Sequence, residues 1–503
     1  MKTRNVISKD MIRVLIASLL ALAAVATAIA QQPQAPRPSS KGAIIKGKAP
    51  VNKEVLKVKL PKPQETKLSN GMQVLILEDH KLPTFSMQMV FLSGGLADPA
   101  GAEGSAQYAA NMLREGTRTR NSREIAEQID RLGASLGANA GLTSFTSTVN
   151  ASGLVENYDQ ILELFADVIL NATFPADELK KLKDRNLSSL KLQRSQAGFL
   201  TNEMFNRAIY GKHPGGRVAL NAEQIEKISS ESLAKFHSTF YRPNNAIFAI
   251  VGDVNRASVI ASIEKAFAVW KPADVPRTVV PSVEPVGPSK IYVINRVPSV
   301  QTNLMIGTPS IVRTDPDYFA LEVMNQVLGG GGSSRLFLNL REDKGYTYGA
   351  YSNVSSYKYP GTFRANTEVR TDVTKGSMDE LMYELKRIRD EKVPQADFEA
   401  AQRTIVGGWA LQLESPGTAL QNAITQKIYG LPADYWDTYP QKISAITADD
   451  VQRVARKYID LGKLQIIAVG DASKITDIMK GFGTVELLDT DLKPVTARPT
   501  ASN

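Results

Sequence analysis

The sequence contains no cysteine and only three histidines, His80, His213 and His237, in 503 residues. Without cysteine the chain can form no disulfide, no thiolate metal site and no thiol nucleophile. The histidines lie in three separate segments without helical pairing, so each is expected to be a surface or capping residue rather than a metal ligand. Nothing in the sequence selects a site built from carboxylates alone.

The sequence also lacks any long run of lysine or arginine. The formal net charge of +9 is spread along the chain, with part of it at the N-terminus, which argues against a nucleic-acid partner. Apolar residues make up 43% and charged residues 22%, as in a soluble globular protein. The chain is too long for one hydrophobic core, so two or more domains are expected.

The first thirty residues resemble an export signal. A positive segment ending at Arg13 precedes 17 apolar residues that end in the small-x-small pattern Ala28-Ile29-Ala30. This run is shorter than the ~20 residues of a comfortable membrane span. We expect residues 1–30 to be a cleaved signal peptide, which leaves a periplasmic protein without a stable membrane span. The alternative is a retained N-terminal anchor with the protein facing the periplasm.

Proline-rich segments divide the remainder of the chain. Residues 31–52 are predicted to be a flexible leader, and residues 271–290 contain five prolines and are predicted to be an interdomain linker. The predicted domains are therefore 53–270 and 291–488. The tail, 489–503, is predicted to be disordered.

The two predicted domains look like copies of each other. The helical patterns of residues 228–240 and 446–458 match position by position, and each opens with a serine or threonine that suits a helix N-cap. Gly252 and Gly470, in the similar segments that follow, lie 218 positions apart, the same offset as between the two helical patterns. A shared offset over such a distance indicates an internal duplication.

Strand-like and helical segments are mixed within each copy. Residues 68–79, 85–95 and 145–151 have β-type patterns, with long helical patterns between and after them. Hairpin-like strands beside helices indicate an α+β fold, in which helices pack on one face of a largely antiparallel sheet.

Two helices are predicted early in the chain. Residues 104–117 follow a glycine-rich turn and carry core-like apolar residues. Residues 121–134 place Ile125 and its helical neighbours on one buried stripe, with Asn121 or Ser122 as the N-cap.

Two linked motifs carry a resemblance to a known family. Residues 68–104 with the helix that follows, and 328-LGGGGSSRLFLNLREDKGYTYGAYS-352, resemble the insulinase-like zinc metallopeptidases. That group includes pitrilysin, the mitochondrial processing peptidase and smaller bacterial members. The resemblance covers about residues 53–490, in order, and includes the duplication. It implies two homologous α+β domains, arranged as a bilobal half of a clamshell.

The resemblance also implies that this chain lacks the family's zinc ligands and general base. Active members carry His-x-x-Glu-His on the helix: two imidazoles on one helical face bind zinc, the glutamate acts as general base, and a later glutamate is the last ligand. In this sequence these positions hold Gln107, Ala110, Asn111 and, by the family's spacing, Ser188, with Ser189 as the neighbouring choice. Neutral carboxamides are weak zinc donors and alanine cannot act as a base, so neither a metal site nor catalytic residues are expected here.

A second family signature is present. Active members use an arginine and a tyrosine of the second domain to contact the substrate, and these correspond to Arg341 and Tyr348, with Tyr346 as the nearer alternative. A phenol can donate to the developing oxyanion and a guanidinium can hold a backbone carbonyl. The plain alternatives are a surface helix arginine and a half-buried strand tyrosine.

The glycine run 329–332 lacks the Gly-Lys-Ser/Thr ending of a phosphate loop, so a turn that lets the backbone approach a neighbouring element is expected instead. Residues 210–216 are predicted to be a loop in which Lys212 and His213 have no catalytic geometry.

Together these features predict a non-catalytic subunit that positions substrate in a heterodimeric periplasmic zinc peptidase acting on peptides or unfolded protein. Zinc is expected in the homologous catalytic partner and no cofactor in this chain. The alternative is a non-enzymatic scaffold or peptide-binding protein of the same fold.

Overall fold

The structure is a computed structural model that describes residues 57 and 60–495. The predicted signal peptide, 1–30, and leader, 31–52, lie outside the described residues. Among the residues described, no helix is both long enough and apolar enough to cross a membrane.

The first half of the chain forms a six-stranded sheet with the order β1-β2-β6-β3-β5-β4. Neighbouring strands are antiparallel except β2 and β6, which are parallel. The strands β2, β3 and β5 fall in segments whose sequence patterns predict strands, whereas β1 and β4 do not. The bounds are β1 Gln64–Lys67, β2 Gln73–Glu78, β3 Thr84–Phe91, β4 Ser135–Ala140, β5 Ser147–Leu154 and β6 Ala246–Gly252.

The second half forms a sheet with the order β12-β7-β11-β8-β10-β9. Its β7 pairs in parallel with both β11 and β12, and the other pairs are antiparallel. Five strands thus repeat the order of the first sheet, while the sixth comes from a different part of the chain. The bounds are β7 Lys290–Asn295, β8 Gln301–Pro309, β9 Thr347–Val354, β10 Thr362–Arg370, β11 Gln465–Gly470 and β12 Val485–Leu488.

The helices also repeat. In α3 the N-cap is Asn121, which forms a capping box with Glu124, so Ser122 is the first helical residue rather than the cap. The equivalent helices α8 and α16 are capped by Ser229 and Thr447, as their sequence patterns predict. The bounds are α2 Ser105–Met112, α3 Ser122–Arg131, α4 Tyr158–Leu170, α5 Ala176–Arg194, α6 Ala197–Tyr210, α7 Ala222–Lys227, α8 Ser230–Phe240, α9 Arg256–Ala266, α10 Tyr318–Leu328, α11 Arg335–Phe337, the π-helix η5 Leu338–Asp343, α12 Thr374–Asp390, α13 Gln395–Gln412, α14 Pro416–Tyr429, α15 Tyr439–Ser444, α16 Ala448–Tyr458 and α17 Ala472–Lys480.

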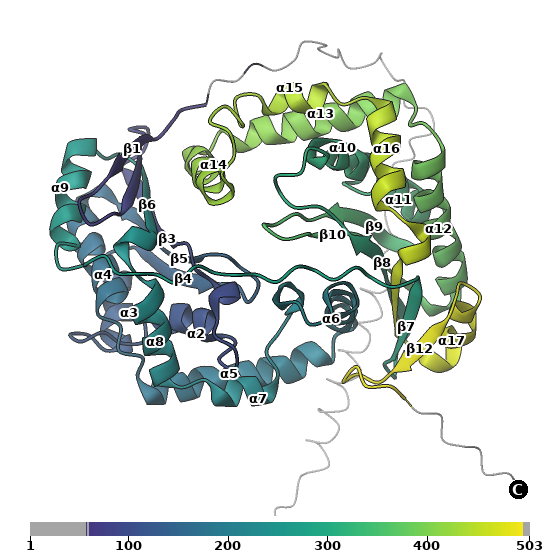
Figure 1. Cartoon of the computed structure of the whole chain (residues 1–503), viewed down its shortest axis with the longest axis horizontal. Helices are drawn as coiled ribbons and strands as arrows, with labels where there is room; N and C mark the ends of the chain where they lie inside the picture. The colour runs from purple at the N-terminus through teal and green to yellow at the C-terminus, as the bar shows by residue number, and fades with distance from the viewer. Residues whose placement is uncertain (1–56, 58–59, 496–503) are drawn as a thin grey trace, which may run out of the picture. The chain divides into compact units, whose positions relative to one another are not determined.

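Each sheet packs its own helices on one face, as predicted, and a helix of the other half on the opposite face. In the second half, α10, α12 and α16 share a core with one face of the sheet, whereas α6 of the first half lies on the other face (Figure 1). Phe205 of α6 is fully buried against this second face. Reciprocally, Leu420 and Ile424 of α14 pack on β2 and β6 of the first sheet. This exchange of helices is not apparent in the sequence.

The segment between the halves and the start of the tail are both packed. Residues 271–289 contain no helix or strand, but Val280 and Val283 contact the cluster beneath α6. Leu492 is buried in the same cluster, and its carbonyl accepts a hydrogen bond from Arg207 at 3.1 Å. The prediction of a disordered tail is therefore wrong for residues 489–495, because Leu492 adds to an apolar core.

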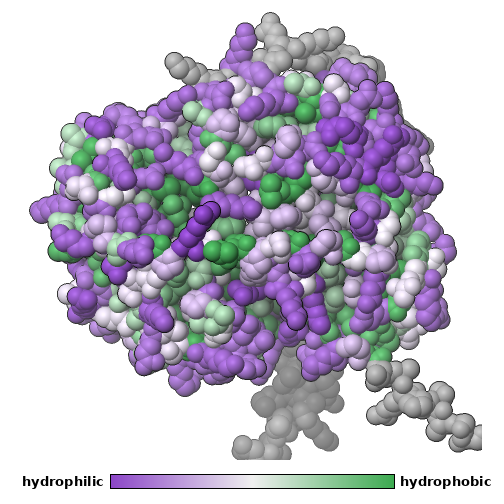
Figure 2. All heavy atoms as spheres, viewed as in Figure 1, coloured by the Kyte–Doolittle hydropathy of each residue, from purple (hydrophilic) through white to green (hydrophobic). Residues whose placement is uncertain are grey.

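Hydrophilic side chains cover most of the face shown in Figure 2, and apolar ones lie among them in small groups. A partner meeting this face would contact a surface of mixed polarity.

Candidate functional site

The side chain of Asp98 binds the backbone at the start of helix α2. The carboxylate accepts hydrogen bonds from the backbone N–H groups of Gly104, at 2.7 Å, and Ala106, at 2.8 Å. Gly104 has a φ of +92°, a left-handed conformation that favours glycine, and its α-carbon faces the side chain of Leu220. Burial raises the pKa of Asp98 to about 6 despite these hydrogen bonds.

Gln107, Ala110 and Asn111 lie together on α2. Gln107 and Asn111 are one turn apart, so they share a face of the helix, and both side chains are half-buried. Ala110, which the resemblance places at the position of the general base, is buried at 1% exposure. In the part of the chain that the structure describes, the side-chain amides of Gln107 and Asn111 form no hydrogen bond.

The fourth predicted position lies on α5. Ser188, on α5, is exposed, and its hydroxyl donates to the carbonyl of Asp184 at 2.9 Å. Ser189 is exposed too, and accepts from Gln193 at 3.2 Å.

Asn186 of α5 contacts α2. It donates to the buried phenol oxygen of Tyr108 at 2.7 Å. This pair is not apparent in the sequence, because a motif spacing defines a position along a helix only to within a residue or two.

The residues at these four positions do not fit a zinc ion. Two neutral carboxamides, a methyl group and a serine hydroxyl supply no imidazole or carboxylate ligand and no base. Within residues 57 and 60–495, no group of three or more His, Asp and Glu side chains is arranged to hold a metal ion.

The three histidines have other partners. His213 is buried and accepts from the N–H of Gly215 at its Nδ1, while its Nε2 donates to the carbonyl of Pro281; burial lowers its pKa. His237 donates to the carbonyl of Ile169, and its pKa is also lowered by burial. His80 lies 2.6 Å from Asp253, whose hydrogen bond raises the histidine pKa.

In the second half, Arg341 lies on the π-helix η5, a type of segment frequent at functional sites. Its guanidinium stacks on the ring of Phe337, 4.8 Å from the ring centre, and lies 3.5 Å from Glu342. The ring of Phe337 in turn packs against Tyr351 of β9, 5.7 Å between centres. Arg341 is thus connected, through Phe337 and Tyr351, to β9, the strand that carries Tyr348.

Tyr348 projects from a β-bulge. Thr367 pairs with Ala350, and Val369 pairs with Thr347, so Tyr348 and Gly349 of β9 together oppose the single residue Glu368 of β10. Bulges re-aim side chains and are frequent beside active sites. The side chain of Tyr348 is 91% exposed.

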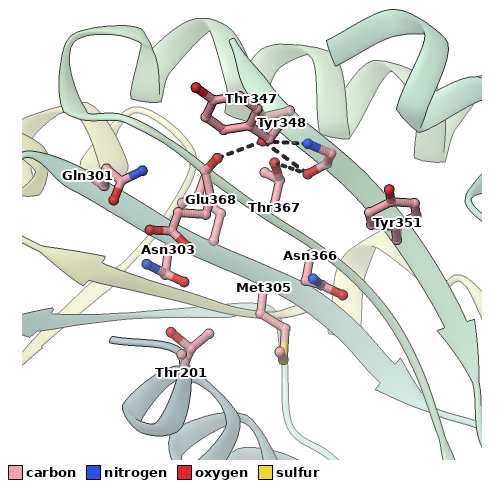
Figure 3. Close-up of a pocket in the computed structure, with 13 residues that line it drawn as sticks. Thr201, Gln301, Asn303, Met305, Thr347, Tyr348, Tyr351, Asn366, Thr367 and Glu368 are labelled. Carbon is pink, nitrogen blue, oxygen red and sulfur yellow. Dashed lines mark hydrogen bonds between the residues drawn. The ribbon is translucent and has the colours of Figure 1, made fainter. Parts of the chain in front are cut away.

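Two hydroxyl groups stabilise the bulge. Thr347 donates to the carbonyl of Glu368 at 2.6 Å and accepts from the N–H of Gly349 at 3.1 Å, and Thr367 donates to the carbonyl of Gly349 at 3.0 Å (Figure 3). The alternative Tyr346, by contrast, is half-buried and packs over Gly376 and the core of the second half. Of the two tyrosines, Tyr348 is therefore the one free to meet a ligand.

Tyr348 borders a cavity of about 470 Å³ between α6 and the second sheet. Figure 3 shows Asn303, Asn366 and Glu368 on adjacent strands of the sheet, with Thr201 of α6 on the opposite side. No motif marks these residues in the sequence, although the alternation of polar residues along β10 indicates a polar face of the sheet.

The glycine run is a close-approach turn, as predicted. A side chain at Gly329 would lie 2.2 Å from the backbone nitrogen of Ser352 in β9, whose N–H donates to the Gly329 carbonyl at 2.9 Å. The run therefore anchors the strand that carries Tyr348.

Comparisons with known proteins define the class. The family models described as "Insulinase (Peptidase family M16)" and "Peptidase M16 inactive domain" match residues 73–223 and 227–405. Among curated proteins, the uncharacterized zinc protease YmxG of Bacillus subtilis is 23% identical over 77% of this chain and 93% of its own length. An uncharacterized zinc protease of Rickettsia bellii is 26% identical over 81% of this chain and 98% of its own.

Solved structures agree. The crystal structure of a peptidase M16 inactive domain from Pseudomonas fluorescens is 27% identical, with a TM-score of 0.75 over 81% of this chain and 97% of that chain. A protease from Helicobacter pylori, at 20% identity, shares the fold with a TM-score of 0.74 over 82% of this chain and 100% of its own. The protein therefore has the two-domain α+β fold of bacterial peptidases. It is a homologue of the insulinase (M16) family zinc proteases, of the two-domain bacterial type.

Proposed function

We propose that this chain is the non-catalytic, substrate-positioning subunit of a heterodimeric zinc peptidase that acts on peptides or unfolded protein. The observation that carries the proposal is a contrast within one molecule. Gln107, Ala110 and Asn111 occupy the metal positions without any group that binds zinc or accepts a proton, whereas Tyr348 remains 91% exposed beside a polar cavity.

In this proposal a homologous partner supplies the metal and the base, and this chain supplies donors to the substrate. The phenol of Tyr348 donates to the oxygen that becomes negative as the peptide carbonyl is attacked. The guanidinium of Arg341, oriented by Phe337, holds a backbone carbonyl of the same peptide. Neither role requires a metal in this chain.

The proposed compartment is the periplasm, because the first thirty residues resemble a cleavable export signal. Retention of that segment would instead leave an anchored protein that faces the same compartment. A stable complex would require an interface of about 1,200–2,000 Å² or more.

The experiment that tests the proposal compares the purified chain alone, a homologous partner with intact His-x-x-Glu-His alone, and the two mixed, on a quenched fluorescent peptide. We expect no zinc in the isolated chain by elemental analysis, no cleavage by it, and chelator-sensitive cleavage by the mixture.

Stoichiometric zinc and chelator-sensitive cleavage by this chain alone would contradict the proposal. A mixture that cleaves no faster than the partner alone would favour the non-enzymatic scaffold or peptide-binding function.

A further inference from the structure

A second cavity lies farther along the same side of the second sheet. It has a volume of about 330 Å³ and lies between α6, the loop after α6 and the strands β9 and β10. Its lining includes two arginines, Arg217 and Arg364, and no aspartate or glutamate. The cavity bordered by Tyr348 differs in charge, because its lining includes Glu368 and no arginine or lysine.

The position of Arg364 is fixed by two amides. Its Nη1 donates to Oδ1 of Asn202 at 3.0 Å, and that oxygen also accepts from Asn206 at 3.2 Å. Asn206 further donates to the backbone carbonyl of Asn202 at 2.8 Å. These partners are neutral, so the charge of Arg364 is not balanced within this network.

The acids near the second guanidinium lie outside the cavity lining. Arg217 forms an ion pair of 3.8 Å with Glu103 and interacts electrostatically with Asp98, but neither carboxylate lines the cavity. The phenol of Tyr359 stays protonated near neutral pH, since burial raises its pKa to about 12. Two arginines and neutral donors without an acid match the two oxygens of a carboxylate.

The two cavities are in register along β9 and β10. Asn366 pairs with Tyr351 and both line the first cavity, whereas Arg364 pairs with Asn353 and both line the second. Alternate residues of a strand share a face, so both cavities lie on one face of the sheet. Because of the bulge, the stretch from Tyr348 to Asn353 faces Glu368 to Arg364 of β10. That is a rise of four residues or about 14 Å, which an extended peptide spans in four to five residues.

We propose that the second cavity binds a carboxylate of the peptide, either its C-terminus or an aspartate or glutamate side chain. It would lie four to five residues from the peptide bond at Tyr348. The spacing rests on the proposed function, whereas the binding of a carboxylate does not. The chain would then select peptides by an acidic group at a fixed distance from the cleavage point.

The test is equilibrium binding of fluorescent ten-residue peptides to the full chain without a partner. One pair has no acidic side chain and ends in a free carboxylate or an amide. A second pair is amidated and carries aspartate or asparagine at an internal position. We expect the carboxylate to tighten binding about tenfold or more in at least one pair, which identifies its source.

Arg364→Gln and Arg217→Gln should each abolish most of this preference. The matched control Arg123→Gln, at a side chain that is 86% exposed on α3, should retain it. The two cavity variants lie on different elements, so a folding defect in one leaves the other as the test. Equal binding of acid and amide peptides in both pairs, or a preference that persists in both variants, would overturn the proposal.

Mapping the cleavage position by mass spectrometry, with the partner added, tests the spacing separately. We expect the cut four to five residues from the carboxylate, and cuts unrelated to it would contradict the spacing. If no partner yields cleavage but the isolated chain still prefers the carboxylate, the proposed function fails and the carboxylate site stands.

Discussion

The two sheets repeat the same five-strand order, but they differ at their final edge strands. In the first sheet, β4 pairs with β5 in unbroken register and presents small residues. In the second, the equivalent pair is interrupted by the bulge that exposes Tyr348. A duplicated framework thus tolerates a local irregularity in one copy, and that irregularity exposes Tyr348, the residue that we propose contacts the substrate.

The helices α2 and α10, which hold equivalent places in the two halves, differ as well. At the start of α2, Asp98 accepts only backbone hydrogen bonds and burial raises its pKa. At the start of α10, Asp317 lies within 2.8 Å of donors on Arg453, Lys457 and Tyr458. The aspartate at the start of each helix is therefore held by different means: Asp98 by backbone N–H groups and Asp317 by two ion pairs and a phenol.

The largest effect should come from the exchanged helices. Phe205→Ala and Leu420→Ala remove buried side chains that join one half to the sheet of the other, so each should lower the free energy of unfolding by about 2–5 kcal/mol. Denaturant unfolding followed by fluorescence measures this loss. The control Val269→Ala, at a 77% exposed side chain, should change little. Two separate transitions, with only one shifted in either variant, would show that the halves are stable independently.

A smaller effect is expected on the pH dependence of stability, which should differ between the aspartates at the start of α2 and α10. Burial opposes ionisation of Asp317, but hydrogen bonds from Lys457, Arg453 and Tyr458 outweigh it and lower the pKa from 3.8 to about 2. Its stabilisation is present above pH 4 and lost as the pH falls through 2. We expect Asp317→Asn to cost about 2 kcal/mol at pH 7.

The pKa of Asp98 is shifted in the opposite direction to that of Asp317. Its pKa is raised to about 6, so ionisation costs stability above pH 6, and this cost is relieved as the pH falls towards 4. Asp98→Asn should therefore be more stable relative to the unmodified chain at pH 7 than at pH 4. Urea titrations at each pH measure both variants, and parallel pH profiles for the two would contradict the difference between the helices.

The smallest predicted effect concerns the bulge. Thr347→Val removes the hydroxyl that bonds to Glu368 and Gly349, a loss of about 1 kcal/mol, so cleavage by the mixed complex should fall roughly fivefold. Thr476→Val, which removes a similar hydroxyl bond on α17, is the control. An unchanged rate would mean that the bulge does not position Tyr348.

Much of the fold could be predicted from the sequence. Helix caps and strand patterns are local features, so they can be predicted without tertiary information, as at Asn121, Ser229 and Thr447. The shared offset follows from comparing two segments of the same sequence. The exchange of α6 and α14 could not be predicted, because an apolar helical face does not specify which sheet it covers. Leu492 was placed in a disordered tail for the same reason.

The candidate site was predictable only in part. The vacated positions on α2 and the Arg341/Tyr348 pair came from the resemblance, while the bulge and the exposure of Tyr348 depend on the register of β9 and β10. The arginine cavity joins residues more than a hundred positions apart, Asn202 and Arg364 among them, which no motif connects.

The most direct measurement of the central claim is the cleavage rate of the mixed complex with Tyr348→Phe in this chain and an unmodified partner. We expect kcat to fall about 10²–10³-fold, because one hydroxyl donor to the oxyanion is lost. Tyr383→Phe, at a 51% exposed tyrosine on α12, should leave the rate unchanged. A Tyr348→Phe complex that cleaves at the normal rate would contradict the account.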